Sequence, residues 1–456
     1  MAQLVKPVQN TDIYTVKLYT QPFTWSSEHE LDVTSEVASK FVLTEKINSY
    51  HTAEITLKEG KYKFNDTTSE YYMFRGMRFK ITYNGRDYKM IVRSINPDIK
   101  NGVVSVSLSS HSYDLYNPPF AQIRVQNSLD GNYYIEDVIW RALYDTGQQN
   151  FFVIKLQDGS YFTPSFSPDN KIQMEANDDV VYTRVPVINI INDLCAKTGC
   201  IWYESDYPDN DMLSVINIVS VESDYDAPED KIVYISAYDQ AFDIRPTKDF
   251  DTLSNTIYFD NLPFYVQENE SIDRYGSRSG KVIKFPDDGD MEKYNRLMFS
   301  MRSVLRDPEV SIPISCRRLL NIPSLDSFVK IVDDEENYST DIGIDRKYRI
   351  NEIKYDFMRN ATFLDIGNRY RKIWLEKLED LAKGVEDNKD SNERQLFGYQ
   401  DELRIQVHTD TDDLDSSLTE TSTGFGVRLD VDCPYDATYS TKSKFYMSDD
   451  GVRTGN

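Results

Sequence analysis

Histidine and cysteine most often supply the general bases, nucleophiles and metal ligands of protein sites, and this chain has four of each. Neither set is spaced as a site requires. No two histidines lie at a helical or hairpin distance, and no Cys-x-x-Cys pair occurs. We therefore expect exposed or hydrogen-bonded histidines and reduced, buried thiols. The residues are His29, His51, His111 and His408, and Cys195, Cys200, Cys316 and Cys433.

Runs of acidic residues are a second kind of candidate, because closely spaced carboxylates can bind Ca²⁺. Residues 408–415 alternate carboxylates as a calcium loop does, but they lack the glycine after the third ligand position and the later glutamate. Residues 285–290 and 206–211 are similar. The runs favour solvated loops, with calcium binding as the alternative. No metal and no cofactor is predicted.

Motifs of the familiar enzyme classes do not occur in the sequence. It has no Gly-x-Ser-x-Gly elbow, no glycine-rich phosphate loop and no dinucleotide fingerprint. A Ser-His-Asp triad or a pair of glycosidase carboxylates can be assembled by a fold without regular spacing, so the sequence does not identify such a site. Enzymatic activity has no positive support, and we predict that the chain is not an enzyme.

Composition limits the class of protein. A chain of 456 residues is too long for one core and suggests about three folding units. Its 75 acidic and 51 basic residues give a net charge of −24, which argues against a protein that tracks nucleic-acid phosphates. No apolar run is long enough for a signal peptide or a membrane span. These features predict a globular protein that is synthesised and folded in a cytoplasm.

Patterns of alternation predict strands over most of the chain. Residues 14–19 alternate with period two, and residues 79–83 and 86–92 flank Asn84-Gly85. Both turn residues tolerate positive φ, which the type I′ turn of a tight hairpin requires. Further strands are expected in a hairpin about residues 100–102 and in the segments 41–44, 53–57, 213–219, 256–259, 328–332, 348–353 and 403–407.

Two short helices are predicted between these strands. Residues 136–144 place apolar side chains on one face, and Gly147 follows as a stop. Residues 186–198 have helical spacing, with Pro186 in the first turn and Gly199 at the end. The strand 200–203 comes directly after this helix. We expect helix and strand to pack as one unit.

A longer helix is predicted from residue 368 to 385. Its apolar residues recur at steps of four and three, which makes a heptad-like seam less than three heptads long. Such a seam either contacts other copies of the chain or packs on its own subunit. The candidate contact residues are Tyr370, Trp374, Leu378, Leu381 and Val385.

Two distant segments share a pattern. Phe79-Lys80-Ile81 followed by residues 86–90 is similar to Val329-Lys330-Ile331 followed by residues 346–350. The second connection is ten residues longer. This similarity indicates either two related β-barrels in one chain or two unrelated hairpins of common composition.

The order of these pieces resembles the hub proteins of bacteriophage tail baseplates and tail tips. Residues 32–37, 41–48 and 52–57, followed by 74–81, resemble the first barrel of that family. The helix 187–196 with residues 199–203 is similar to its middle domain. Residues 253–257 and 271–276 match its later L-x-N-x-I and S-I-x-x-Y-G stretches, and residues 321–325, 329–331 and 348–350 resemble its second barrel. The resemblance covers residues 12–370, and Asp326-Ser327 stands where the family usually has a glycine.

The resemblance implies an α+β, predominantly β fold. It has two related small β-barrels like those of tail tubes, an α/β middle domain, a long helix and a β-rich C-terminal extension. The expected domains are a first barrel at 1–112, a middle α/β domain at 113–245, strands completing that domain and a second barrel at 246–365, a helix and linker at 366–393, and the extension at 394–456.

The resemblance also implies a mechanical function. Three chains with two barrels each would present six similar barrels, which join a six-fold tail tube to a three-fold tip or spike around a lumen for DNA. The implied partners are the chain itself as a homotrimer, a tail tube or distal tail protein, and a spike, fibre or tape-measure protein. The implied location is the virion tail. Alternatives are a tail-associated cell-wall hydrolase and a carbohydrate-binding receptor protein.

Overall fold

A computed structural model describes residues 14–20, 27–59, 63–116, 120–125, 133–164, 169–174, 180–207, 213–220, 229–237, 240–250, 253–259, 265–283, 305–306, 308–332, 347–368, 444–448 and 451–455. The chain divides into two compact units. The first contains residues 1–283 and 290–379, and the second contains residues 284–289 and 380–456. In the second unit the described part is an antiparallel hairpin of β23 (Lys444–Ser448) and β24 (Gly451–Gly455).

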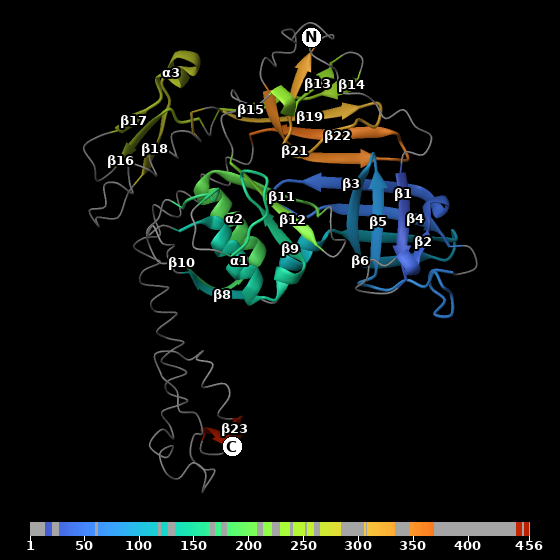
Figure 1. Cartoon of the computed structure of the whole chain (residues 1–456). Helices are drawn as coiled ribbons and strands as arrows, with labels where there is room; N and C mark the ends of the chain where they lie inside the picture. The colour runs from blue at the N-terminus through green and yellow to red at the C-terminus, as the bar shows by residue number, and fades with distance from the viewer. Residues whose placement is uncertain are drawn as a thin grey trace. The chain divides into compact units, whose positions relative to one another are not determined.

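A 14-stranded sheet is the main element of the first unit (Figure 1). We call its N-terminal half the first module and its C-terminal half the second module. The first module contains β1 (Tyr14–Tyr19), β2 (Glu30–Asp32), β3 (Val37–Lys46), β4 (Thr52–Lys58), β5 (Arg78–Tyr83), β6 (Arg86–Asp98) and β7 (Val103–Ser109). The second contains β13 (Ile232–Ser236), β14 (Ala241–Ile244), β15 (Thr247–Asp249), β19 (Glu309–Cys316), β20 (Phe328–Val332), β21 (Lys347–Asp356) and β22 (Ala361–Gly367).

Sequence alternation explains these strands. In β1, Val16 and Leu18 are fully buried while the alternating residues Thr15 and Lys17 are partly exposed. The predicted hairpin between β5 and β6 is present, and its turn residues have the positive φ angles that a tight turn needs, 50° at Asn84 and 77° at Gly85. The predicted strands of the two modules are confirmed. Residues 403–407 lie outside the described part of the chain.

The two modules have the same strand order. Neighbouring strands run β1-β5-β6-β7-β4-β3 in the first and β13-β20-β21-β22-β19 in the second, where β14 and β15 both pair with β19 in the place of β3. When the strands of each module are numbered along the chain, leaving out β2 and counting β14 and β15 as one interrupted strand, both follow the same permutation. One pairing differs, since β1 is antiparallel to β5 whereas β13 is parallel to β20.

The modules also share their register. Lys80 lies opposite Lys89 in the β5–β6 pair, and Lys330 lies opposite Lys347 in the β20–β21 pair. The register against the next strand then shifts between Val92 and Ser94 in β6, and at the matching step, between Ile350 and Glu352, in β21. A bulge at the same place in both copies supports an internal duplication over a chance similarity of hairpins.

The register corrects one part of the sequence match. Residues 329–331 do align with 79–81, but Lys347 corresponds to Lys89 and not to Asp87. In the second strand the true correspondence is therefore shifted by two residues from the sequence match. Because side chains in a strand alternate with period two, such a shift leaves every residue on the same face and cannot be detected from the hydrophobic pattern.

A ladder between β3 and β21 joins the modules into one sheet. It runs antiparallel from Val42 opposite Asp356 to Lys46 opposite Glu352. At its end the rings of Phe41 and Phe357 lie 4.2 Å apart between centroids, and the Phe357 N–H donates to the Phe41 carbonyl. The described strand pairs do not include one that closes either module on itself. The two barrels therefore remain a prediction.

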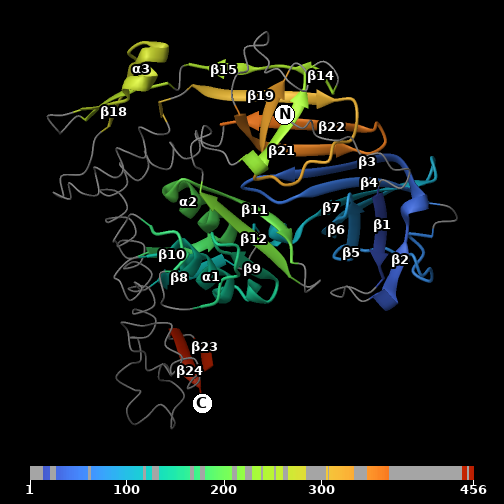
Figure 2. The same cartoon turned by 45° about the horizontal axis from the view of Figure 1, so that its top comes forward.

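A helix–sheet domain is inserted between the modules, as Figure 2 shows. Its helices α1 (Ile135–Asp145) and α2 (Val187–Thr198) share a core with a three-stranded sheet. Gly199, at φ 66°, ends α2 as predicted, whereas Pro186 lies just before the helix, at its N-cap. The three-stranded sheet contains β9 (Phe152–Lys155), β11 (Cys200–Asp206) and β12 (Ser214–Ser220), and a separate antiparallel pair contains β8 (Phe120–Val125) and β10 (Val180–Pro186).

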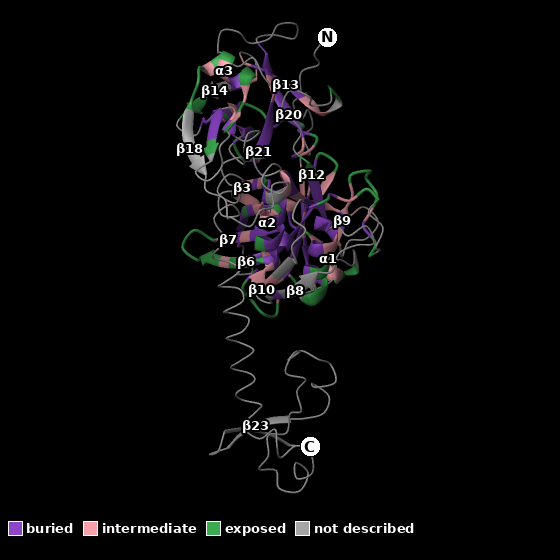
Figure 3. Cartoon of the chain, turned by 90° about the vertical axis from the view of Figure 1, so that its left-hand side faces the viewer, coloured by how far each residue is buried: buried purple, intermediate pink, exposed green. Residues whose placement is uncertain are grey.

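Helix α2 and the strand β11 that follows it pack as one unit, as expected. Trp202 of β11 is fully buried, and its indole N–H donates to Asn192 of α2 over 2.7 Å. In Figure 3 the buried residues, in purple, run through α2 and along the strands behind it. A smaller sheet of β16 (Thr256–Phe259), β17 (Tyr265–Gln267) and β18 (Ser279–Ile283) follows with α3 (Asn269–Tyr275).

Short 3₁₀ turns connect several elements. They are η1 (Ser27–His29), η2 (Thr34–Glu36), η4 (His111–Leu115), η5 (Gln148–Asn150) and η6 (Glu229–Lys231). In the part of the chain that the structure describes, no helix combines the length and apolar character needed to cross a bilayer.

Candidate functional site

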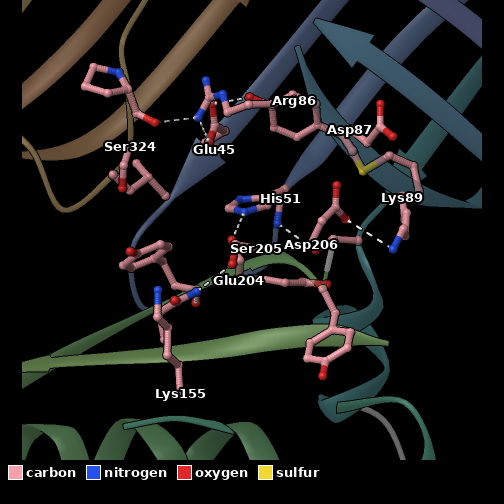
Figure 4. A pocket seen from close by; sticks show the side chains of 18 of the residues that line it. Glu45, His51, Arg86, Asp87, Lys89, Lys155, Glu204, Ser205, Asp206 and Ser324 are labelled. Atoms are coloured by element: carbon pink, nitrogen blue, oxygen red, sulfur yellow. Dashed lines mark hydrogen bonds and ion pairs between the residues drawn. The ribbon is translucent and has the colours of Figure 1, made fainter. Parts of the chain in front are cut away.

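A polar cavity of about 460 Å³ lies where the first module, the second module and the helix–sheet domain meet. Its walls come from the end of β3, the β5–β6 hairpin, the strands β11 and β12, and the loop 323–325 before β20 (Figure 4). Charged and hydroxyl side chains line the cavity, which makes it the candidate functional site. Its main ionisable residues are Glu45, His51, Arg86, Lys89, Glu204 and Asp206.

His51 is held by backbone groups at both ring nitrogens. Its Nε2 lies 2.8 Å from the Glu204 carbonyl and its Nδ1 lies 3.4 Å from the Lys46 backbone N–H. A carbonyl only accepts and an N–H only donates, so in this geometry Nε2 carries the hydrogen and Nδ1 accepts. Its basic nitrogen is therefore not available to take a proton from a substrate. His51 ties β4 to β11, as expected for a hydrogen-bonded histidine.

Glu204 is a buried carboxylate whose partners come from the first module. It accepts hydrogen bonds from the Ser112 backbone N–H at 3.1 Å and from the Ser112 hydroxyl. Burial acts to raise the pKa of Glu204, but His51, His111 and the serine hydroxyls outweigh it and the net shift is downward. Burial lowers the pKa of His111 to about 4, so this imidazole is neutral at pH 7.

Lys89 and Asp206 form a second contact across the cavity. The Lys89 side chain is 3% exposed, and its Nζ lies 3.9 Å from an Asp206 carboxylate oxygen. Burial raises the pKa of Asp206 to about 7 in spite of this cation. The pair therefore joins β6 to the end of β11 most strongly above neutral pH, where the carboxylate is charged.

The third contact joins the two modules. Arg86 of β6 donates to Glu45 of β3 over 3.2 Å and to the Tyr355 hydroxyl of β21 over 3.2 Å. The Tyr88 hydroxyl donates to the same Glu45 carboxylate over 2.8 Å. Burial and the negative charge of Glu45 raise the pKa of Tyr88 well above its ordinary value. This cluster lies beside the β3–β21 ladder and reinforces it.

Taken together, the charged groups of the cavity bind one another. Glu45 accepts from Arg86 and Tyr88, Glu204 accepts from Ser112, and Asp206 lies 3.9 Å from Lys89. No group of three or more potential metal ligands occurs among the described residues. The arrangement is suited to holding three parts of the chain in a fixed relation, since buried hydrogen bonds and ion pairs favour a single geometry.

Sequence reasoning did not select Glu45 or Glu204, although the strand pattern contained a signal. Glu45 follows Phe41 and Leu43 on the inward face of β3, and Glu204 follows Trp202 on that of β11. A carboxylate at a position that period two assigns to the core needs a buried partner. That alternation marks both residues, but it does not say which partner each would meet.

The other candidates have the following outcomes. Cys195, Cys200 and Cys316 are free, buried thiols, as predicted, and burial raises the pKa of Cys200 to about 12. The five seam residues lie outside the described residues, as do His408, Cys433 and the runs at 285–290 and 408–415; of the run 206–211, residues 206 and 207 are described. The long helix and its seam therefore stay predictions.

Comparison with known proteins gives no sequence match: no family model and no curated protein is detectably similar to the chain. Solved structures are similar to it. A prophage tail protein, gp18, from Listeria monocytogenes is 15% identical with a TM-score of 0.49, and the likeness covers 82% of this chain and 99% of that one. The prophage MuSo2 43 kDa tail protein from Shewanella oneidensis is 12% identical with a TM-score of 0.49, covering 78% and 98%.

A tail protein from Neisseria meningitidis is 12% identical with a TM-score of 0.48, covering 80% of this chain and 98% of that one. These structural neighbours are tail proteins, the class to which the sequence resemblance points. A TM-score below 0.5 is too low to support a functional argument by itself.

Proposed function

We propose that the chain is the structural hub of a phage tail baseplate or tail tip, a trimeric adaptor between a six-fold tail tube and a three-fold tip or spike. The observation that supports this most is the repeat of strand order, register and bulge in the two modules. A chain with two equivalent modules offers two equivalent docking surfaces. Three such chains offer six, which matches a six-fold ring above while keeping three-fold symmetry below.

The polar cavity suits this role because an adaptor must keep its two modules in a fixed relation under load. Glu45, Arg86 and Tyr355 connect the modules directly, and Glu204 and Asp206 tie the helix–sheet domain to the first module. Each module would close as a small barrel of the tail-tube type. The helix–sheet domain would act as a brace, not as a catalytic domain.

The net charge of −24 supports a lumen for DNA. Carboxylates facing the lumen would repel a passing duplex and prevent it from adhering to the wall. The proposed neighbours are a tail tube or distal tail protein above and a spike, fibre or tape-measure protein below, in the tail of the virion. A map of the assembled ring with the acidic residues on the outer rim would contradict the proposed lumen.

The mass and symmetry of the purified chain test the adaptor role. Mass photometry is expected to give three times 53.0 kDa, and negative-stain class averages are expected to show a three-fold ring with six similar lobes. A ring with another number of lobes, or a chain that stays monomeric at ~10 µM both alone and in the presence of tail-tube rings, would overturn the proposal.

A cell-wall hydrolase is the competing function from a different class. Among the described residues that line the cavity, His51 supplies the imidazole. Both of its ring nitrogens are held by backbone groups and not directed at a substrate. We therefore expect the purified chain to leave a peptidoglycan zymogram unchanged. A clearing zone would favour the hydrolase.

A further inference from the structure

Among the described strands, the second half of β6 has one partner where its counterpart in the second module has two. In β21, residues Glu352–Asp356 pair with β22 on one side and with β3 on the other. In β6, residues Ser94–Asp98 pair with β7, and within the described residues no strand lies along their other edge. This end of β6 is exposed from Asn96 onward, as the green colour in Figure 3 shows.

The strand that corresponds to β3 in the second module also has a single partner among the described strands. β3 pairs with β4 and β21, whereas β14 and β15 pair with β19 alone among the described strands. Figure 2 shows β14 and β15 beside β19 at the border of the sheet. The residues Arg245–Lys248 are exposed there. The β3–β21 ladder thus uses one edge of each module, and the two equivalent edges have no partner among the strands that the structure describes.

We propose that the β14–β15 edge pairs with the β6 edge of a second copy of this chain, in the register of the internal β3–β21 ladder. The inference rests on the proposed trimer, in which internal and intermolecular ladders would alternate around the ring. Pairing through exposed strand edges is an established way for one chain to bind another.

The shared register of the modules fixes which residues would meet. The internal pair Lys354–Thr44 corresponds to Asn96–Thr247, and the pair Asp356–Val42 corresponds to Asp98–Arg245. Opposite charges would therefore lie directly across the ladder at Asp98 and Arg245, an arrangement that stabilises an antiparallel pair.

The end of the ladder gives a second match. Inside the chain it closes on the contact of Phe41 and Phe357. The corresponding residues at the open edges are Ile244 and Ile99, and Ile99 is 66% exposed. An isoleucine exposed to this extent beside the free edge of β6 in the described structure is suited to burial against an apolar partner.

Prolines make the proposed register specific. Pro97 of β6 corresponds to Tyr355, and Pro246, between β14 and β15, corresponds to Leu43, which lies opposite Tyr355. In the proposed register the two prolines face each other, so the missing N–H donors weaken a single rung. In any other register the two prolines would remove hydrogen bonds at two separate residue pairs of the ladder. Edge prolines also discourage indiscriminate strand addition.

A disulfide tests the register. In the double variant Asn96→Cys/Thr247→Cys, the two new thiols would face each other across the proposed ladder. Their internal counterparts, Lys354 and Thr44, lie directly opposite each other on neighbouring strands, a spacing within disulfide range. After mild oxidation, non-reducing electrophoresis is expected to show covalent dimers and trimers of the 53.0 kDa chain. The single variants and the out-of-register variant Asn96→Cys/Arg245→Cys are expected to give at least ~10-fold less product.

The outcomes separate this inference from the proposed function. A trimer by mass in which the in-register pair cross-links no better than the out-of-register pair would overturn the edge pairing and leave the hub in place. Failure to form any trimer would overturn both. As a second measurement, Arg245→Asp is expected to weaken the trimer and Asp98→Arg in the same chain to restore it; a trimer insensitive to both changes would also contradict the pairing.

Discussion

Gly367 is a residue at which the backbone leaves no space for a side chain. It has φ of +145°, and a Cβ there would lie 2.0 Å from the Val310 carbonyl oxygen. The atom in the way belongs to the backbone of β19, which cannot rotate aside. The close approach of β22 and β19 thus depends on glycine at this position.

We predict that Gly367→Ala lowers the free energy of unfolding by at least about 2 kcal/mol, from backbone strain and the displacement of β19. Urea denaturation measures it. Gly102→Asn is the matched control, because Gly102 also has positive φ but a Cβ there meets nothing within 4 Å and asparagine tolerates this conformation. Equal losses in the two variants would contradict the steric explanation.

Glu136 is a fully buried carboxylate at the start of α1 that accepts two contacts from the Ile172 backbone N–H. Burial raises its pKa to about 7. The folded state therefore holds this proton more tightly than the unfolded state, where the pKa is ordinary. As pH rises from about 4.5 to about 7, this group makes the free energy of unfolding fall, and above pH 7 its effect is constant.

Glu136→Gln removes that dependence, because the amide keeps an acceptor for Ile172 and does not ionise. The variant is expected to gain up to about 3 kcal/mol relative to the parent between pH 4.5 and 7.5, as measured by urea unfolding across pH. Glu54→Gln, at an exposed surface pair with Lys40, is the control and should leave the pH profile unchanged. Parallel profiles for Glu136→Gln and the parent would refute the assignment.

At the scale of elements, the junction of β3, β6 and β21 combines a strand ladder with a buried ion pair. Glu45 is 6% exposed and Arg86 29% exposed at their side chains, and both contact groups on other strands. Removing one member leaves the other charge buried without its partner, which costs more than the pair contributes when intact.

We expect Arg86→Met to lower the free energy of unfolding by about 3 kcal/mol, and Arg86→Met/Glu45→Gln to lower it by clearly less than the sum of the single variants. Lys40→Met breaks an exposed pair with Glu54 and should cost at most about 1 kcal/mol. Additive losses at Arg86 and Glu45 would show that the two side chains do not act together.

At the scale of the whole molecule, the proposed assembly has two contributions of different origin. The edge pairing comes from described strands, whereas the seam of residues 370–385 comes from the sequence pattern alone. The two can be distinguished because they involve different residues and different forces, backbone hydrogen bonds in one and burial of apolar side chains in the other.

Leu378→Asp/Leu381→Asp is expected to reduce the trimer to the 53.0 kDa monomer in sedimentation if the seam is an oligomer contact. Lys383→Asp, on the opposite face of the predicted helix, adds negative charge away from the seam and should leave the trimer intact. An unchanged trimer in the leucine variant would assign the seam to packing within its own subunit.

Local features could be predicted because they depend on neighbouring residues. The Asn84-Gly85 turn, the helix end at Gly199 and the strand β20 follow from conformational preference and from alternation over a few residues. The polar cavity could not be predicted. Arg86 meets Glu45 and Tyr355 across 41 and 269 residues of sequence, and no local pattern specifies partners at such separations.

The sequence by itself determined the β-rich character, the short helices, the buried thiols and the match of residues 79–81 with 329–331. Each of these depends on side chains close together along the chain. The tertiary structure decided the correct register of the repeat, the joining of both modules by β3 and β21, and which edges stay open. A strand pattern has period two and so reads the same after a shift of two residues, whereas hydrogen bonding between strands accepts one register.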